Sequence, residues 1–318
     1  MSRRLFPLMV LGLAFAACED EQPSPVAPIA PELSAHSGER GPSRPFEVYT
    51  QNVYLGGDTG PLFTLDFSNI PAVVAATNVF WQQVERSAAP ERMAAIVDEI
   101  EARRPHVVGL QKVLRCVVAS GTGAVTGGLH LLAVIDAEVA ARGLPYTTEV
   151  IQPATSATLP LAVSSTGITQ ALNFTDRLVV LRRNDVTLTS EASGLYAAVA
   201  PLGPVTLKRG WARVSVDYNG TPHNFITTHL EVQALAPVQA GQTQQLLQQV
   251  VAGLAGVTIL AADLNSDAAA QQGDPSWTNT YDLVREAGFD DVWTLAPGGH
   301  RRDGFTCCQA NDLRNRRS

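Results

Sequence analysis

The dipeptide Asn219-Gly220 is the feature that most constrains the fold of this chain. It separates two segments rich in β-forming residues, 211–218 and 223–230. Asn and Gly readily adopt the positive φ angles of a two-residue hairpin turn, so the two segments are predicted to pair as antiparallel strands. Elsewhere, strand-like apolar runs alternate with helical patterns, which is typical of α/β proteins. We therefore expect mixed sheets covered by helices, not a purely parallel sheet.

Hydrophobic periodicity predicts the remaining elements. Helix 87–103 is expected to start at a capping Ser87 and to bury a stripe that contains Met93 and Val97. Residues 54–86 and the glycine-rich segment 121–128 are predicted to be loops. The other expected strands are 46–53, 106–113, 147–152, 177–182 and 257–262, and the other expected helices are 129–142, 239–254 and 280–287.

The N-terminus has the pattern of an export signal. Two arginines precede an apolar segment, Leu5–Ala17, that is too short to span a bilayer and ends in small residues before Cys18. This pattern resembles a bacterial lipobox, in which Cys18 becomes the lipidated N-terminus; ordinary cleavage near Ala17 is the alternative. Residues 18–45 are proline-rich and are expected to be a flexible tether. We thus predict an exported, lipid-anchored protein of the cell envelope with one domain over 46–318.

The charge pattern disfavours nonspecific electrostatic binding of nucleic acid. The formal net charge is −7, and Lys112 and Lys208 are the only lysines. A bound metal ion could still supply local positive charge. Export permits disulfides. Cys116 could pair with Cys307 or Cys308, or the last two could pair with each other, and a zinc site is not indicated.

Four segments place polar side chains at the end of an apolar run. They are Thr50-Gln-Asn-Val53, Pro105-His-Val-Val-Gly-Leu-Gln-Lys-Val113, Phe225-Ile-Thr-Thr-His-Leu-Glu231 and Ile259-Leu-Ala-Ala-Asp-Leu-Asn-Ser266. Strand ends are rigid, so several of them can direct side chains into one cleft. We predict that Asn52, Lys112, His229, Asp263 and Asn265 converge.

In order and spacing these segments resemble the motifs of the endonuclease/exonuclease/phosphatase superfamily, from Phe46 to the chain end. The family has an Asn on the first strand, then G-L-Q-E, T-H-L and G-D-x-N. Segments 175–182, 209–213 and 304–309 extend the resemblance. It implies a four-layer α/β/β/α sandwich with two mixed, mostly antiparallel sheets. The activity implied is metal-dependent hydrolysis of phosphoric esters.

The resemblance also implies roles for individual residues. Asp263 would orient or deprotonate the attacking water, and Asn265 would contact the phosphate or the metal. Asn52 would lie on the metal side, and the candidate metal ligands are Asn52, Asp263 and Asn265. His229 would donate a hydrogen bond to the phosphate, and Asp176 would orient it. Carboxylate and amide oxygens suit Mg²⁺, with Mn²⁺ or Ca²⁺ as alternatives.

Two departures from the family pattern predict impaired activity. Lys112 stands where the family has its metal-ligating Glu. Unit charges about 4 Å apart interact by roughly 4 kcal/mol at an effective dielectric near 20, and the exchange changes two charge units beside a divalent ion. The family also continues into an R-I-D strand and a terminal S-D-H motif, whereas this chain ends at Ser318. We expect a C-terminally truncated domain; a complete but degenerate protein is the alternative.

Two functions remain open at this point. The first is a monomeric phosphodiester hydrolase, impaired as given, acting on nucleic acid, a phospholipid headgroup or a small phosphate ester. The second is a non-catalytic envelope lipoprotein that binds a ligand on the same scaffold. Lys112 favours the second function, whereas His229, Asp263 and Asn265 favour the first.

Lipid attachment at Cys18 is directly testable. Mass spectrometry of the protein purified from bacterial envelopes should find a lipid-modified Cys18 as the first residue. The Cys18→Ala variant should carry no lipid. An unmodified mature start on either side of Cys18 would contradict the lipobox prediction.

Overall fold

The computed structural model describes residues 45–297 together with Thr306. The predicted signal segment, Cys18, nearly all of the tether, and the two C-terminal cysteines lie outside these residues. Within the described part of the chain, no helix is long and apolar enough to cross a membrane. Cys116 is a buried free thiol, and burial raises its pKa to about 12.

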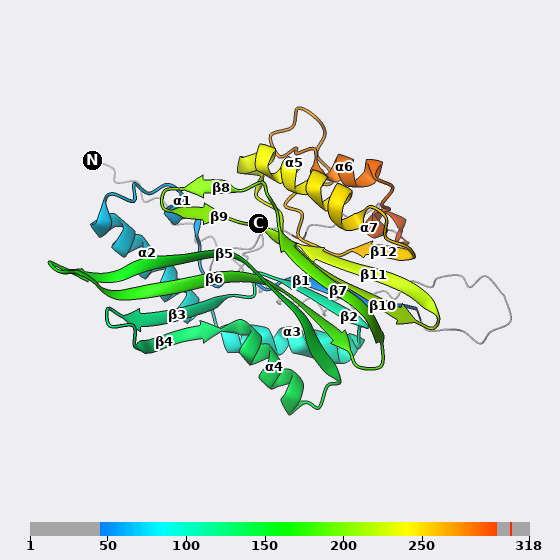
Figure 1. The fold of residues 1–318 in the computed structure, drawn as a ribbon, viewed down its shortest axis with the longest axis horizontal. Coiled ribbons are helices and arrows are strands. Elements are labelled where there is room, and N and C mark those ends of the chain that lie inside the picture. Colours follow the sequence, from blue (N-terminus) through cyan, green and yellow to red (C-terminus); the bar gives the residue numbers. More distant parts are fainter. Residues whose placement is uncertain (1–44, 298–305, 307–318) are drawn as a thin grey trace, which may run out of the picture. The chain divides into compact units, whose positions relative to one another are not determined.

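Two larger sheets and one short ribbon form across residues 45–297 (Figure 1). The six-stranded sheet has the order β1-β2-β6-β3-β4, with β5 also paired to β6, and the four-stranded sheet has the order β12-β11-β10-β7. The strands are β1 (Val48–Asn52), β2 (Val107–Gln111), β3 (Arg115–Ser120), β4 (Val125–His130), β5 (Tyr146–Ser164), β6 (Gly167–Arg183), β7 (Thr187–Leu195), β8 (Ala200–Leu202), β9 (Val205–Leu207), β10 (Gly210–Tyr218), β11 (Thr221–Thr228) and β12 (Val257–Leu260). Strands β8 and β9 form the ribbon.

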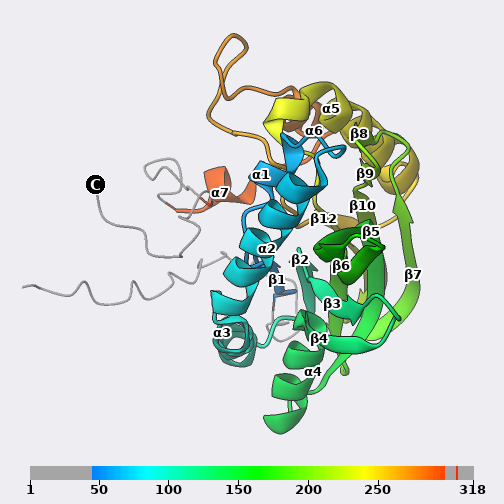
Figure 2. The ribbon, with the colours of Figure 1, turned by 90° about the vertical axis from the view of Figure 1, so that its left-hand side faces the viewer.

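Helices cover the outer face of each larger sheet. They are α1 (Gly60–Phe63), α2 (Ile70–Arg86), α3 (Ala89–Arg103), α4 (Leu131–Ala141), α5 (Ala236–Gln245), which continues as a π-helix (Leu246–Val251), α6 (Thr280–Glu286) and α7 (Val292–Leu295). Helices α2, α3 and α4 share a core with the six-stranded sheet (Figure 2). The π-helix packs its buried face on the four-stranded sheet, and a third core lies between the sheets. The predicted four-layer α/β/β/α sandwich is therefore confirmed.

The Asn219-Gly220 hairpin is confirmed, with φ angles of 55° and 77° and antiparallel pairing of β10 with β11. Parallel pairing is limited to β1 with β2 and β11 with β12 among the described strands, so the sheets are mixed and mostly antiparallel. These two parallel pairs contain the four motif segments. Parallel neighbours end at the same sheet edge, which brings the motif residues together.

Three predictions of local structure were wrong. Residues 70–86 form helix α2 instead of a loop, because Val73, Thr77, Phe80 and Val84 recur with helical spacing and are buried. Ser87 ends α2, and the N-cap of α3 is Ala88. The glycine-rich segment contains β4, which pairs with β3 through backbone groups that need no large side chains.

The side chains of strand β6 exchange sheet faces halfway along the strand. Leu172, Val179 and Leu181 belong to the helix-covered core, whereas Leu178 and Val180 belong to the core between the sheets. Residues 172 and 179 could not share a face in an uninterrupted strand, because side chains alternate. The change falls between the stretch of β6 paired with β3, which ends at Thr175, and the stretch paired with β2, which begins at Val179; Asp176 lies in this interval.

The two sheets approach each other closely at Gly109. A Cβ atom there would lie 2.8 Å from Cζ of Phe225 and 3.0 Å from Cβ of Thr227. Beside it, Gln111 Nε2 donates to Thr227 Oγ1 at 2.7 Å and to Thr50 Oγ1 at 2.9 Å. These contacts hold the end of β2 against β11 and β1, where the motif residues lie.

Gly109→Ala should destabilise the protein by about 1–3 kcal/mol, because the added methyl group overfills the contact between the sheets. Gly127→Ala is the matched control, since its Cβ would meet only Val118, at 3.9 Å. It should be neutral or slightly stabilising. Urea denaturation measures both free energies of unfolding. Equal values for the two variants would contradict the close approach at Gly109.

Candidate active site

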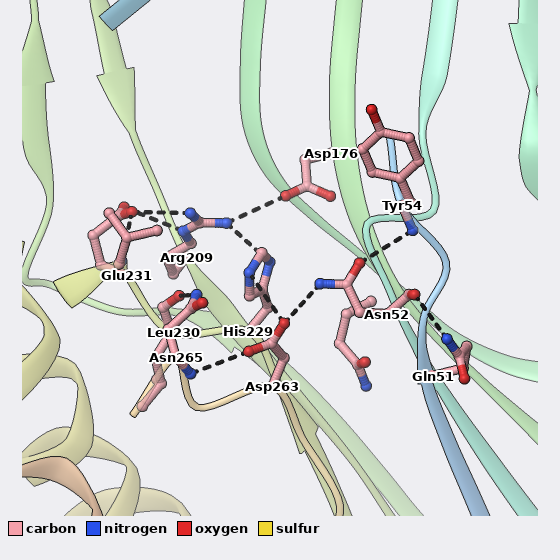
Figure 3. A network of polar contacts seen from close by, with 12 residues as sticks. Gln51, Asn52, Tyr54, Asp176, Arg209, His229, Leu230, Glu231, Asp263 and Asn265 are labelled. Atoms are coloured by element: carbon pink, nitrogen blue, oxygen red, sulfur yellow. Dashed lines mark hydrogen bonds and ion pairs between the residues drawn. The ribbon is translucent and has the colours of Figure 1, made fainter. Parts of the chain in front are cut away.

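The carboxylate of Asp263 is held in a fixed orientation by two asparagines. Asn52, the last residue of β1, donates from Nδ2 to Asp263 Oδ2 at 2.7 Å, and the backbone N–H of Asn265 donates to Oδ1 at 3.1 Å (Figure 3). Each asparagine is itself fixed: Tyr54 N donates to Asn52 Oδ1, and Asn265 Nδ2 donates to the carbonyl of Leu230. The structure thus brings Asn52, Asp263 and Asn265 together, as predicted.

His229 lies beside Asp263, because the two residues form a parallel bridge just beyond β11 and β12. Arg209 Nη1 lies 2.9 Å from His229 Nδ1. A guanidinium can only donate, so Nδ1 accepts and the ring proton of the neutral imidazole must be on Nε2. Burial, followed by the charges of Arg209 and Lys112, holds the pKa of His229 well below its ordinary value. The 3.8 Å approach of Nε2 to Asp263 Oδ2 is therefore not an ion pair at neutral pH.

Sequence reasoning missed Arg209 and Glu231 as site residues. The guanidinium donates from Nε to Glu231 Oε2 at 3.1 Å and from Nη2 to Oε1 at 2.9 Å. Glu231 is 1% exposed, so this is a buried, bidentate ion pair. Both residues adjoin recognised motifs: Glu231 follows Thr228-His-Leu230, and Arg209 precedes Gly210-Trp211. An acidic residue straight after a buried strand was the available signal.

Asp176 lies on the other side of Arg209. Its Oδ2 is 3.6 Å from Arg209 Nη1, so Arg209, not Asp176, contacts the imidazole of His229. Burial raises the pKa of Asp176, against the opposing charges of Arg209 and Lys112. Its Oδ1 is buried without a hydrogen-bond partner among the described residues, as is Nε2 of His229. Buried polar atoms are nearly always paired, so two such atoms in one cluster indicate a site for a ligand.

Lys112 joins the cluster from the end of β2, where its φ angle is 59°. It is partly buried and, among the described residues, forms no ion pair. Burial lowers its pKa, and the negative charge of Asp263 is the largest opposing influence. All five residues predicted to converge therefore lie in or around one polar cluster at the strand ends.

The donor set does not fit a divalent cation as it stands. No group of three His, Cys, Asp or Glu side chains within the described residues is arranged to hold a metal ion. Both oxygens of Asp263 already accept hydrogen bonds, and both oxygens of Glu231 are bound by Arg209. The ammonium of Lys112 adds a positive charge where a cation would need a negative one. Magnesium binding stays a prediction for this chain.

Comparison with solved structures gives matches of low sequence identity. An endonuclease/exonuclease/phosphatase from Beutenbergia cavernae is 22% identical, with a TM-score of 0.45; the match covers 63% of this chain and 50% of that one. A family protein from Leptotrichia buccalis is 13% identical, with 64% and 69% covered and a TM-score of 0.41. The human Nocturnin catalytic domain with bound sulfate is 14% identical, with 63% and 62% covered and a TM-score of 0.38.

The match thus spans half the length of the Beutenbergia protein. No protein-family model matches the sequence, and no curated protein matches it.

Arg209→Met should destabilise the protein by about 3–5 kcal/mol, because it leaves the carboxylate of Glu231 buried without its partner. Arg285→Met is the control: the side chains of Arg285 and Asp290 are 40% and 73% exposed, and such pairs contribute about 0–1 kcal/mol. Thermal and urea unfolding compare the two variants. If Arg209→Met lowers the free energy of unfolding no more than the control does, the pair of Arg209 and Glu231 is solvated.

Proposed function

We propose that the chain is a phosphoric ester hydrolase of the endonuclease/exonuclease/phosphatase type in which Lys112 slows the reaction. One observation supports this proposal above the others. The Nε2–H of His229 is buried, has no hydrogen-bond partner in the described part of the chain, and is fixed in its tautomer by Arg209. A neutral, preoriented N–H donor beside a carboxylate suits a phosphoryl oxygen, whose negative charge increases during hydrolysis.

The side chains around it divide the chemistry between them. Asp263 is 28% exposed at its side chain, so water reaches it, and Asn52 and Asn265 fix its orientation. It is the group placed to accept a proton from an attacking water. His229 would hold the phosphoryl group in place. Arg209 would keep the imidazole oriented while Glu231 neutralises the guanidinium.

A divalent cation would supply the charge neutralisation that this set of side chains lacks. We propose that Mg²⁺ binds when position 112 carries the carboxylate of the family pattern, with Mn²⁺ or Ca²⁺ as alternatives. Asn52, Asp263 and Asn265 are the remaining oxygen donors on that side of the cluster. With Lys112 in place, the ammonium opposes the cation.

The substrate is proposed to be a phosphodiester. The net charge of −7 and the two lysines favour a phospholipid headgroup or a small ester over nucleic acid, whose backbone requires a basic surface. The export pattern and Cys18 favour a lipid-anchored protein of the cell envelope. We propose that it acts as a monomer.

A non-catalytic binding lipoprotein is the second candidate function. Lys112 is the observation that favours it, because a lone ammonium can hold an anionic ligand while providing less charge than a divalent ion for the transition state. This candidate shares the ligand site with the first and differs from it in turnover.

Hydrolysis of methyl 4-nitrophenyl phosphate across a Mg²⁺ titration separates the two candidates. The unmodified protein should turn over negligibly, and Lys112→Glu should gain at least about tenfold in kcat/KM. The gain should require Mg²⁺ and should disappear when Asp263→Ala is added. Lys208→Glu is the control for the charge change.

Two outcomes would count against this account. Failure of folded Lys112→Glu to hydrolyse the ester at any Mg²⁺ concentration would contradict the proposal that Lys112 is the residue that slows the reaction. Rapid turnover by the unmodified protein that is lost in Asp263→Ala would show that Lys112 does not impair the site.

A further inference from the structure

The backbone around Lys112 is fixed on both sides. Val53 N donates to the carbonyl of Gln111 at 2.9 Å, and Val113 N donates to the carbonyl of Arg177 at 3.0 Å. Lys112 lies between these two bonds with a φ of 59°, a conformation that costs energy for a side chain other than glycine. The surrounding structure therefore holds this strained residue in one place, between the strand that ends at Asn52 and the strand that carries Asp176.

Lys112 and Arg209 differ in whether a carboxylate pairs with their positive charge. The guanidinium of Arg209 is bound by the carboxylate of Glu231 through two hydrogen bonds. The ammonium of Lys112 interacts electrostatically with Asp263, Asp176 and Glu231 but pairs with no carboxylate among residues 45–297. Lys112 thus has donors available for a ligand, whereas Arg209 is already occupied.

A second donor lies in the same cluster and is also unused. His229 is 3% exposed, and its Nε2 has no hydrogen-bond partner within residues 45–297. Two donors without partners, one charged and one neutral, are suited to the two unesterified oxygens of a phosphodiester.

We propose that Lys112 and His229 bind a phosphodiester monoanion directly, so that the ammonium replaces the divalent cation and binding needs no metal. This inference rests on the proposed function, since it assumes that the cluster is the phosphoryl site. It adds the charge state of the ligand and the means of recognition.

The preference for a monoanion follows from the charges at the site. Lys112 supplies one positive charge, and a phosphodiester carries one negative charge. A phosphate monoester is close to a dianion above pH 7, because its second pKa is about 6. Its additional charge would face the carboxylate of Asp263 without a further cation to offset it.

Binding also differs from catalysis in what it requires of the cation. An ammonium donates hydrogen bonds to the bound ester but carries only one positive charge to offset the charge that develops in the transition state. A divalent cation neutralises more of the charge that develops during the reaction. Tight metal-free binding with little turnover is therefore the expected behaviour of the unmodified site.

Isothermal titration calorimetry at pH 8 with two matched probes tests the proposal. Methyl 4-nitrophenyl phosphate is a monoanion, and 4-nitrophenyl phosphate is a dianion. The unmodified protein should bind the first probe equally well in EDTA and in Mg²⁺, and should bind the second roughly tenfold more weakly. Lys112→Met should weaken binding of the first probe by roughly tenfold to a hundredfold.

Two further variants keep the test independent of folding defects. Lys112→Arg keeps the charge and should retain more affinity than Lys112→Met. Lys208→Met removes the other lysine, which is exposed, and should bind as the unmodified protein does. Circular dichroism and thermal melting confirm that each variant is folded.

Each alternative outcome has a separate meaning. Binding that appears only with Mg²⁺, or that survives Lys112→Met unchanged, would overturn the role of Lys112 and leave the proposed hydrolase intact. Preference for the dianion would overturn the charge argument. Absence of binding by the unmodified protein in both buffers would also overturn the inference, and hydrolysis by Lys112→Glu would then decide the proposed function independently.

Discussion

The close approach of the two sheets at Gly109 is the constraint on which the rest of the structure depends. Because residue 109 has no side chain, Phe225 and Thr227 of β11 can reach the backbone of β2. Gln111 then joins the sheets by a hydrogen bond to Thr227. Without this contact, Asn52 and Lys112 on one sheet would be separated from His229 and Asp263 on the other. A packing requirement between the layers thus becomes a requirement of the site.

Much of the site could be predicted because its residues follow buried strands. Asn52, His229 and Asp263 each follow an apolar run, and strand ends can direct side chains into one cleft, so their convergence could be predicted. Lys112 was recognisable by its departure from the motif. Arg209 was not, because its role depends on contacts with Glu231 and Asp176, which lie 22 and 33 residues away in sequence. Such contacts leave no local pattern.

The parts of the fold that could be predicted are those with a clear local sequence pattern or a family resemblance. The hairpin at Asn219-Gly220 follows from backbone preference, and the four layers followed from the family resemblance. Helix α2 was missed although Phe80 and Val84 carry a helical spacing, because the glycines and the proline just before it suggested a longer loop. Strand β4 has few apolar side chains, and backbone pairing with β3 defines it.

The change of facing in β6 has a consequence for comparing this chain with distant relatives. Leu172 and Val179 face the same core although an odd number of residues separates them. An alignment guided by alternating hydrophobicity would follow one half of β6 correctly and place the other half one residue out of phase. The error would begin between Thr175 and Val179, the interval that contains the site residue Asp176. Alignments of this strand are best anchored separately on each side of that residue.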